Sequence, residues 1–344
     1  MNNNNTLETA PVLFSLNRGV SHHHHPIMEC SHRGLISVQD ADGTSLLQVG
    51  ETEARTHMRS CAKPFQLIPV IEEGILEKLS LRDIALFISS HSGETYHTQR
   101  LAEILRLNGL NESDLRCGIH APYHLSTQLD LLLHHQKPTA LHNNCSGKHT
   151  AMLLLCKKLK ADPAYERLDH EIQKRILDVV STIADYDQDK IESGIDGCSL
   201  PSFCLPLSRI ALMYARLGHC DADMKHAQSL VQIWSGAVSY PEYVAGHERF
   251  DTVLMKAAQG TIFSKTGADG MQAISIQTSK RFPKGAGIAI KIIDGDHKQN
   301  IRPLVVKEIL SRLGIWPHDP KLETFMPELH NFRGIRTGSV LCHF

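Results

Sequence analysis

Apolar and polar residues alternate in two stretches of the chain, one near its beginning and one in its last third. Residues 35–38 and 46–49 flank Asp40-Ala41-Asp42-Gly43, a pattern typical of two strands joined by a tight turn. Residues 273–277 and 287–293 have the same texture and predict a second pair of strands. Between about 95 and 260, apolar residues recur at helical spacing instead, which predicts helices over 98–107, 126–133, 150–159, 165–183, 207–217 and 223–239.

The order of these elements predicts an α+β fold, because strands are followed by a long helical block and then by strands again. We assign residues 26–110 and 260–344 to an α/β lobe with a mixed sheet, and residues 111–259 to an inserted, mainly helical lobe. Residues 1–25 are interpreted as a polar lead-in of uncertain order, and the histidine run His22–His25 as a solvated loop.

Composition narrows the class of protein and of partner. A hydrophobic content of 42% and a charged content of 21% are ordinary for a soluble globular protein, and a net charge of −1 gives no reason to expect binding to nucleic acid. No apolar run approaches the roughly 18 residues that a membrane span needs. The nine cysteines lack disulfide-like spacing and the first residues do not resemble a signal peptide, so a cytoplasmic location is expected.

A serine and a lysine three residues apart, Ser60 and Lys63, are the first candidates for chemistry. On a helix this spacing places both side chains on one face, and a desolvated lysine can take the proton of a serine hydroxyl. The pair would be unremarkable without Lys265-Thr266-Gly267 far downstream. A Ser-x-x-Lys motif with a later Lys-Thr-Gly is typical of penicillin-recognising serine acyltransferases, and indicates amide or ester cleavage through an acyl-enzyme.

Two cysteine-containing segments leave more than one interpretation open. The Gly147-Lys148 pair lacks the spacing of a nucleotide-binding loop, so nucleotide binding is rejected. Cys145 with His149 as its base is a weaker alternative to Ser60 as nucleophile. By spacing alone, Cys145 and Cys198 are two buried thiols and no metal site is predicted.

Five sequence blocks occur together in order, and in this combination the chain resembles the class 3, Rhizobium etli-type L-asparaginases. The blocks are Arg59–Gln66, Ser89–Glu94, Asn144–His149, Asp196–Pro201 and Lys265–Ala268. The resemblance covers about residues 32 to 296 and implies a fold similar to serine β-lactamases and glutaminases.

The resemblance also implies roles for individual residues. Two Ser–Lys tandems would meet in the cleft between the lobes, with Ser60 as nucleophile, Lys63 as its base, and Ser92 with Lys265 relaying protons. Arg59 and Asp196 would bind the α-carboxylate and α-ammonium groups of an amino acid, with a structural ion pair as the alternative role for each.

A zinc ion is implied beside the substrate, held by Cys145, Lys148 and Cys198, and the protein is expected to be a homodimer. Thiolates suit zinc, whereas a zinc-bound lysine has to be neutral. This reverses the interpretation of the two cysteines that spacing alone gives.

The predicted function is hydrolysis of L-asparagine to L-aspartate and ammonia. One alternative is a related serine amidohydrolase, such as a glutaminase or a penicillin-recognising enzyme, because one methylene separates asparagine from glutamine and such a difference is discriminated only about 10–200-fold. The other alternative is a non-catalytic zinc-binding protein that keeps the same scaffold.

Overall fold

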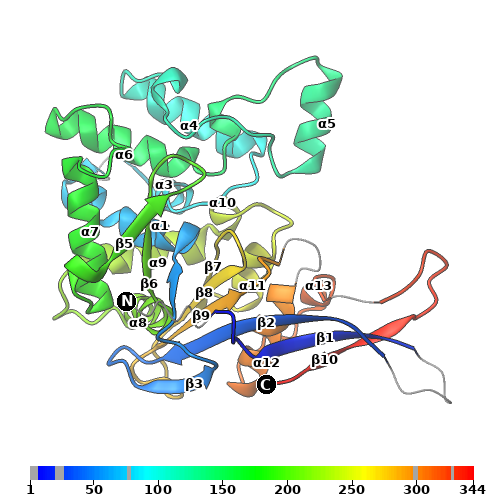
Figure 1. Ribbon diagram of the computed structural model, residues 1–344. Coiled ribbons are helices and arrows are strands. Elements are labelled where there is room, and N and C mark those ends of the chain that lie inside the picture. Colours follow the sequence, from blue (N-terminus) through cyan, green and yellow to red (C-terminus); the bar gives the residue numbers. More distant parts are fainter. Residues whose placement is uncertain (1–6, 20–26, 76–78, 297–300, 327–328) are drawn as a thin grey trace.

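An antiparallel sheet forms the base of the molecule in the computed structural model, which describes residues 7–19, 27–75, 79–296, 301–326 and 329–344 (Figure 1). Within the described residues this sheet has seven strands, in the order β10-β1-β2-β9-β8-β7, with β3 pairing to β2. The strands are β1 (Val12–Arg18), β2 (Ile27–Gln39), β3 (Ser45–Val49), β7 (Ile262–Thr266), β8 (Met271–Ile276), β9 (Ala286–Ile292) and β10 (Gly338–Cys342).

Helices cover both faces of this sheet, so β8 is buried at every position and β9 at every position except Lys291. Ile288 and Ile290 of β9 join a core with helices α11 (Phe250–Ala257) and α12 (Ile301–Arg312). The residue between them, Ala289, faces the opposite side with helix α8 (Leu207–His219). Alternation along the strand thus produces two separate cores. Gly287 lets α8 approach, because a Cβ atom there would overlap the carbonyl oxygen of Ala211.

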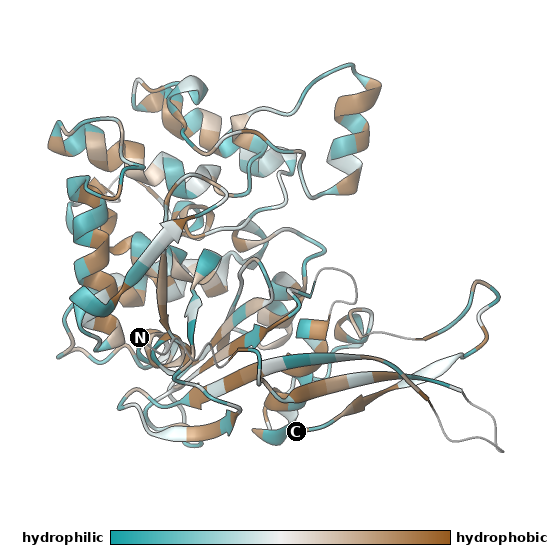
Figure 2. Cartoon of the chain, viewed as in Figure 1, coloured by the Kyte–Doolittle hydropathy of each residue, from teal (hydrophilic) through white to brown (hydrophobic). Residues whose placement is uncertain are grey.

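The remaining helices stack on the α8 side of the sheet as a helical lobe (Figure 1). They are α1 (Lys63–Gln66), α2 (Ile68–Glu72), α3 (Leu81–Phe87), α4 (Thr95–Leu107), α5 (Leu125–Leu133), α6 (Ser146–Leu159), α7 (Glu171–Ala184), α9 (Ala227–Ser239) and α10 (Pro241–Val244). Helix α6 is buried continuously from Ser146 to Cys156, because other helices surround it, whereas α5 has no buried residue and stands apart (Figure 2).

A second, three-stranded sheet with the order β4-β6-β5 joins the two layers. Its strands are β4 (Arg55–His57), β5 (Glu192–Ile195) and β6 (Pro201–Pro206). Immediately after β4 the chain forms the 3₁₀ helix η1 (Arg59–Ala62), anchored by the Met58 amide, which donates to the carbonyl oxygen of Phe203. A short helix, α13 (Pro320–Glu323), packs beneath the large sheet.

The mixed α+β architecture predicted from the sequence is confirmed, and so are the antiparallel pairs β2–β3 and β8–β9. The predicted division into lobes stays a prediction, and helix α8, which falls within 111–259, packs on the sheet. Strand β1 lies inside the predicted polar lead-in and pairs with both β2 and β10. The run His22–His25 lies outside the described residues. Of the helices that are described, none has the length and apolar character to cross a membrane.

Candidate active site

Ser60 and Lys63 lie on one tight turn at the junction of the two layers. Arg59, the residue before Ser60, has φ of +52°, a left-handed conformation that costs a non-glycine residue roughly 1–2 kcal/mol. The turn continues through η1 into α1, where the amide of Lys63 donates to the carbonyl oxygen of Ser60. Ser60 is only 9% exposed and Lys63 is 1% exposed. The predicted Ser-x-x-Lys pair is therefore presented at a helix start, facing the interior.

The Lys63 amine lies among acceptors contributed by two other segments. Its Nζ donates to the carbonyl oxygen of Ser89, to Ser90 Oγ at 3.0 Å and to the carbonyl oxygen of Asn144 at 3.3 Å. Burial lowers the pKa of Lys63 below its ordinary value. A buried amine whose proton is easier to remove is suited to act as a base.

Lys265 approaches the same serine from the edge strand β7. Its Nζ donates to Ser90 Oγ at 2.7 Å and to the carbonyl oxygen of Thr266 at 3.0 Å. Burial, and then the neighbouring charge of Lys63, lower the pKa of Lys265 to about 7. The hydroxyl of Ser90 thus connects two buried lysines whose pKa values both lie below the ordinary value.

Ser92, which the sequence analysis pairs with Lys265, has a different contact. Its hydroxyl donates to the carbonyl oxygen of Ala245 at 3.1 Å, and the described residues include no hydrogen bond between Ser92 and Lys265. Ser90, which the sequence analysis missed, makes that contact instead. The two serines are two residues apart, so an extended segment places both on one face and sequence spacing cannot choose between them.

Two buried side chains fix the turn that carries Ser60. The Cys61 thiol donates to the carbonyl oxygen of Lys265 at 3.3 Å, and the Tyr214 hydroxyl donates to the carbonyl oxygen of Cys61 at 2.9 Å. Burial raises the pKa of Cys61 to about 12, so its side chain stays a neutral thiol. The Ser60 turn is thereby attached both to the strand of Lys265 and to helix α8.

Cys145, Lys148 and Cys198, the predicted metal ligands, come together beside Lys63. Cys145 precedes α6, Lys148 is in the first turn of that helix, and Cys198 lies between β5 and β6. Lys148 Nζ donates to Cys198 Sγ at 3.2 Å. A hydrogen bond from the Cys198 thiol, together with the nearby lysine charges, lowers the pKa of Cys145 well below its ordinary value. Neither cysteine forms a disulfide.

The donor chemistry of this group fits a zinc ion. Among the described residues, no three histidine, cysteine, aspartate or glutamate side chains form a metal-binding group, so two thiols would need Lys148 as the third protein ligand. Without a metal, burial lowers the pKa of Lys148, but the adjacent Cys198 and Cys145 more than offset this and raise it. A bound cation would have to displace that proton. Zinc binding remains a prediction.

Arg59 and Asp196, the predicted substrate-binding pair, contact each other. Arg59 Nη2 lies 3.0 Å from Asp196 Oδ1, and Arg59 Nη1 lies 2.7 Å from Asp269 Oδ2. The Asp196 carboxylate also accepts from the amide of Gly197 at 2.8 Å. The structural ion pair considered as an alternative is therefore present between these two side chains. Binding of an amino acid would require Arg59 and Asp196 to break this ion pair and to form ion pairs with the substrate instead.

The alternative pair of Cys145 and His149 receives no support from these contacts. The Nδ1 atom of His149 forms a hydrogen bond with the Tyr165 hydroxyl at 2.9 Å, and burial lowers the pKa of this histidine well below its ordinary value. This nitrogen of the ring is thus engaged by Tyr165 within the helical lobe.

Comparison with known families decides to which class of protein this arrangement belongs. The family model described as L-asparaginase II matches residues 20–342, nearly the whole chain. The chain belongs to the L-asparaginase II family. Membership supports amidohydrolase activity, as the resemblance of the five sequence blocks implies. No curated protein matches the chain.

Solved structures similar to this L-asparaginase II family member include several glutaminases. A Bacillus glutaminase has 13% identity and a TM-score of 0.44, with 82% of this chain and 91% of that chain covered. A probable glutaminase from Bacillus subtilis, complexed with 6-diazo-5-oxo-L-norleucine, has 14% identity and a TM-score of 0.40, with coverage of 82% and 84%. Mglu in its native form has 11% identity and a TM-score of 0.45, and the chain covers 66% of its length.

Proposed function

We propose that the protein hydrolyses L-asparagine to L-aspartate and ammonia, with Ser60 as the nucleophile. The observation that carries the proposal is the hydroxyl of Ser90, which accepts hydrogen bonds from both Lys63 and Lys265 next to the Ser60 turn. A family whose members cleave the amide of asparagine needs a nucleophile, a base and a proton donor, and these three side chains with Ser60 can supply them.

In the first half-reaction, neutral Lys63 takes the Ser60 proton while Ser60 Oγ bonds to the side-chain amide carbon of the substrate. Protonated Lys265 then supplies a proton through the Ser90 hydroxyl to the leaving nitrogen, the carbon–nitrogen bond breaks, and ammonia departs. In the second half-reaction, water attacks the β-aspartyl ester and gives a proton to the lysines, so that L-aspartate leaves and Ser60 regains its hydroxyl proton. Atoms and charge balance over the cycle.

Ser90 replaces Ser92 in this scheme because of its contacts with the two lysines. The predicted tandem of Ser92 and Lys265 is retained as the competing assignment, and the two serines can be separated by mutation. Backbone amides that stabilise an oxyanion are typically worth about 3 kcal/mol each.

Substrate recognition is proposed to use Arg59 for the α-carboxylate and Asp196 for the α-ammonium group. Their opposite charges match an amino-acid substrate, and the side chains are 25% and 13% exposed, so both can be reached from the solvent. Cys145, Lys148 and Cys198 are proposed to hold zinc, which when bound would orient the substrate as a Lewis acid.

A homodimer in the cytoplasm completes the proposal. None of the nine cysteines forms a disulfide, as expected in a reducing compartment. Helix α5 exposes an apolar face that a second copy could cover, since Leu125, Leu129, Leu132 and Leu133 are each more than half exposed. Sedimentation velocity of the wild-type chain tests the oligomeric state.

The decisive experiment measures ammonia release from L-asparagine and from L-glutamine, side by side, with the purified full chain and its Ser60→Ala variant. We expect turnover of asparagine that the variant lacks. A clear preference for glutamine contradicts the substrate assignment, whereas an active Ser60→Ala enzyme contradicts the nucleophile. Hydrolysis of a coloured β-lactam instead of either amide would identify a penicillin-recognising enzyme.

A further inference from the structure

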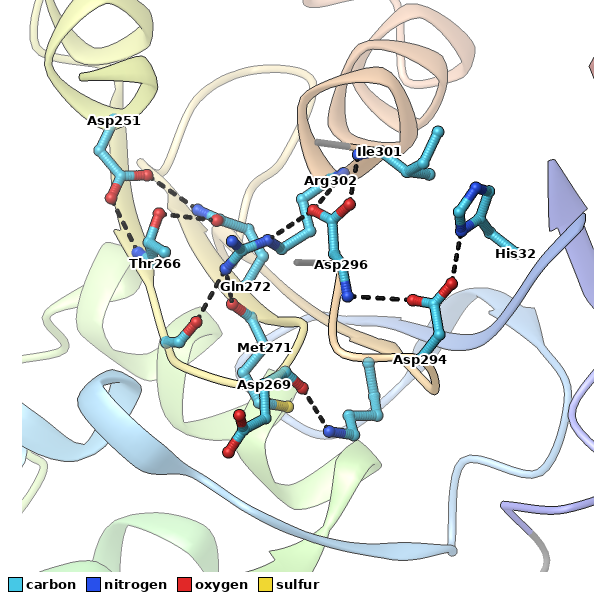
Figure 3. Close-up of polar contacts among 12 residues, drawn as sticks. His32, Asp251, Thr266, Asp269, Met271, Gln272, Asp294, Asp296, Ile301 and Arg302 are labelled. Carbon is cyan, nitrogen blue, oxygen red and sulfur yellow. Dashed lines mark hydrogen bonds and ion pairs between the residues drawn. The ribbon is translucent and has the colours of Figure 1, made fainter. Parts of the chain in front are cut away.

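Lys265 is held in position by a carboxylate that neither the sequence motifs nor the proposed mechanism includes. Asp251, in the first turn of α11, is 2% exposed and lies against β7 (Figure 3). Its Oδ1 accepts from Ser264 Oγ at 2.7 Å and its Oδ2 accepts from the amide of Thr266 at 2.8 Å. One side chain therefore binds the residues on both sides of Lys265.

The position of β7 explains why this strand needs such an anchor. β7 is at the edge of the sheet, and of the described strands only β8 pairs with it. The amide of Gly267 donates to β8, at the carbonyl oxygen of Met271, whereas the amide of the preceding residue, Thr266, has no strand beside it and donates to Asp251. The carboxylate takes the place that a neighbouring strand would occupy.

A third contact ties the carboxylate to the inner strand. Gln272, which is opposite Thr266 on β8, donates through Nε2 to Asp251 Oδ1 at 2.9 Å and to Ser264 Oγ at 2.9 Å. The side-chain oxygen of Gln272, Oε1, in turn accepts from the Thr266 hydroxyl at 3.0 Å (Figure 3). The group is closed on itself, because each polar side chain in it has a partner from the same group.

We propose that Asp251 is a positioning residue for catalysis, which fixes the backbone on both sides of Lys265 and supplies the buried negative charge that keeps the Lys265 ammonium available as proton donor. The inference rests on the proposed function, because it assigns Lys265 the role of acid. The hydrogen bonds of the Asp251 carboxylate within the described part of the chain go to Ser264, Thr266 and Gln272 and not to Ser60 or Ser90, so we assign it an action through Lys265.

The charges around the two groups are consistent with this role. Burial raises the pKa of Asp251, but the Lys265 ammonium and the three hydrogen bonds more than offset it, so its pKa is below the ordinary value. The groups that act on Lys265 are Lys63 and Arg249, which disfavour its charge, and Asp251 and Cys61, which favour it. Cys61 stays a neutral thiol, so Asp251 is the neighbour that supplies a charge favouring the ammonium.

The test compares Asp251→Asn with Ser264→Ala and with the wild type, by pH profiles of kcat/KM for L-asparagine. Asp251→Asn removes the charge and one acceptor while keeping the shape. Ser264→Ala removes one hydrogen bond to the same carboxylate and leaves the charge. We expect the alkaline limb of Asp251→Asn to move lower by about one pH unit or more, because loss of a neighbouring opposite charge shifts a pKa by roughly 1–3 units, and kcat to fall at least tenfold at unchanged KM. Ser264→Ala should keep the wild-type limb.

Asp251→Glu is the second variant, for the case in which Asp251→Asn does not fold. It keeps the charge but is longer, so the alkaline limb should stay in place while kcat falls. Two results overturn the inference: a folded Asp251→Asn enzyme with the wild-type profile, or Asp251→Glu with wild-type kcat. If the wild type releases ammonia from neither asparagine nor glutamine, the proposed function fails, and the inference fails with it.

Discussion

Replacement of Ser90 by alanine is the perturbation that discriminates best between the two possible proton relays. Ser90 Oγ accepts from Lys265 at 2.7 Å and from Lys63 at 3.0 Å, and hydrogen bonds to charged groups contribute about 1.5–3 kcal/mol each. Loss of a positioned proton-transfer group lowers rates about 10²–10⁴-fold, which corresponds to roughly 3–5 kcal/mol of transition-state stabilisation. Ser92→Ala is the matched control, because it loses one neutral hydrogen bond to Ala245, about 0.5–1.5 kcal/mol.

Both variants are assayed by ammonia release from L-asparagine, with urea unfolding as the measure of stability. We expect Ser90→Ala to lose at least about 100-fold in kcat/KM and Ser92→Ala to stay within about threefold of wild type, while both remain folded. The reverse order of activities would refute the relay through Ser90 and favour the tandem of Ser92 with Lys265.

Three further predictions concern stability, metal and the Ser60 turn. Because burial first, and then Lys63, bring the pKa of Lys265 from 10.5 to about 7, the unfolded chain binds more protons than the folded chain between these pH values. The free energy of unfolding should therefore rise with pH across this window, and Lys265→Met should flatten the rise in urea unfolding experiments; an unchanged slope would contradict the assigned pKa. In metal analysis, Ser60→Ala should keep about one zinc ion per chain without turnover, whereas Cys198→Ser should lose zinc. Loss of zinc from both variants would mean that the nucleophile and the metal site are not separable. An inactive wild type that binds zinc would favour the non-catalytic alternative. Tyr214→Phe leaves the carbonyl oxygen of Cys61 without its donor, so it should cost about 1–3 kcal/mol of stability and lower kcat at constant KM, and a wild-type kcat would argue against a positioning role.

Local patterns were sufficient for the strands that alternate strongly and are paired nearby. β2 with β3, and β8 with β9, follow from alternation and turn residues, because these pairs are adjacent in sequence as well as in space. β1 is missed by the sequence analysis although its sequence contains an apolar run, and it pairs both with β2, the next strand along the chain, and with β10 near the far end. The placement of α8 on the sheet likewise depends on tertiary packing, which its own periodicity does not reveal.

Spacing predicts that Ser60 and Lys63 share one face, whereas the grouping of Lys148 with Cys198 follows from the family resemblance and not from spacing. Ser60 and Lys63 are on one turn, and Lys148 and Cys198 come within 3.2 Å. The contact of Lys265 with Ser90 instead of Ser92 depends on how the segment that carries both serines is placed. The identities of the residues do not determine that placement. The role of Asp251 could not be predicted from the sequence, because a lone aspartate at the start of a helix does not indicate which strand it contacts.

The pairing of β1 with β10 has a consequence for synthesis of the chain on the ribosome. β1 can pair with β2 as soon as both have been made, but its other side remains uncovered until residues 338–342 emerge. During most of translation this strand, with its buried residues Leu13, Phe14 and Leu16, presents an open edge that other chains could extend. We therefore expect β1, more than the helical lobe, to determine how much the chain needs chaperones during expression. The helices of that lobe are neighbours in sequence and can pack on each other earlier.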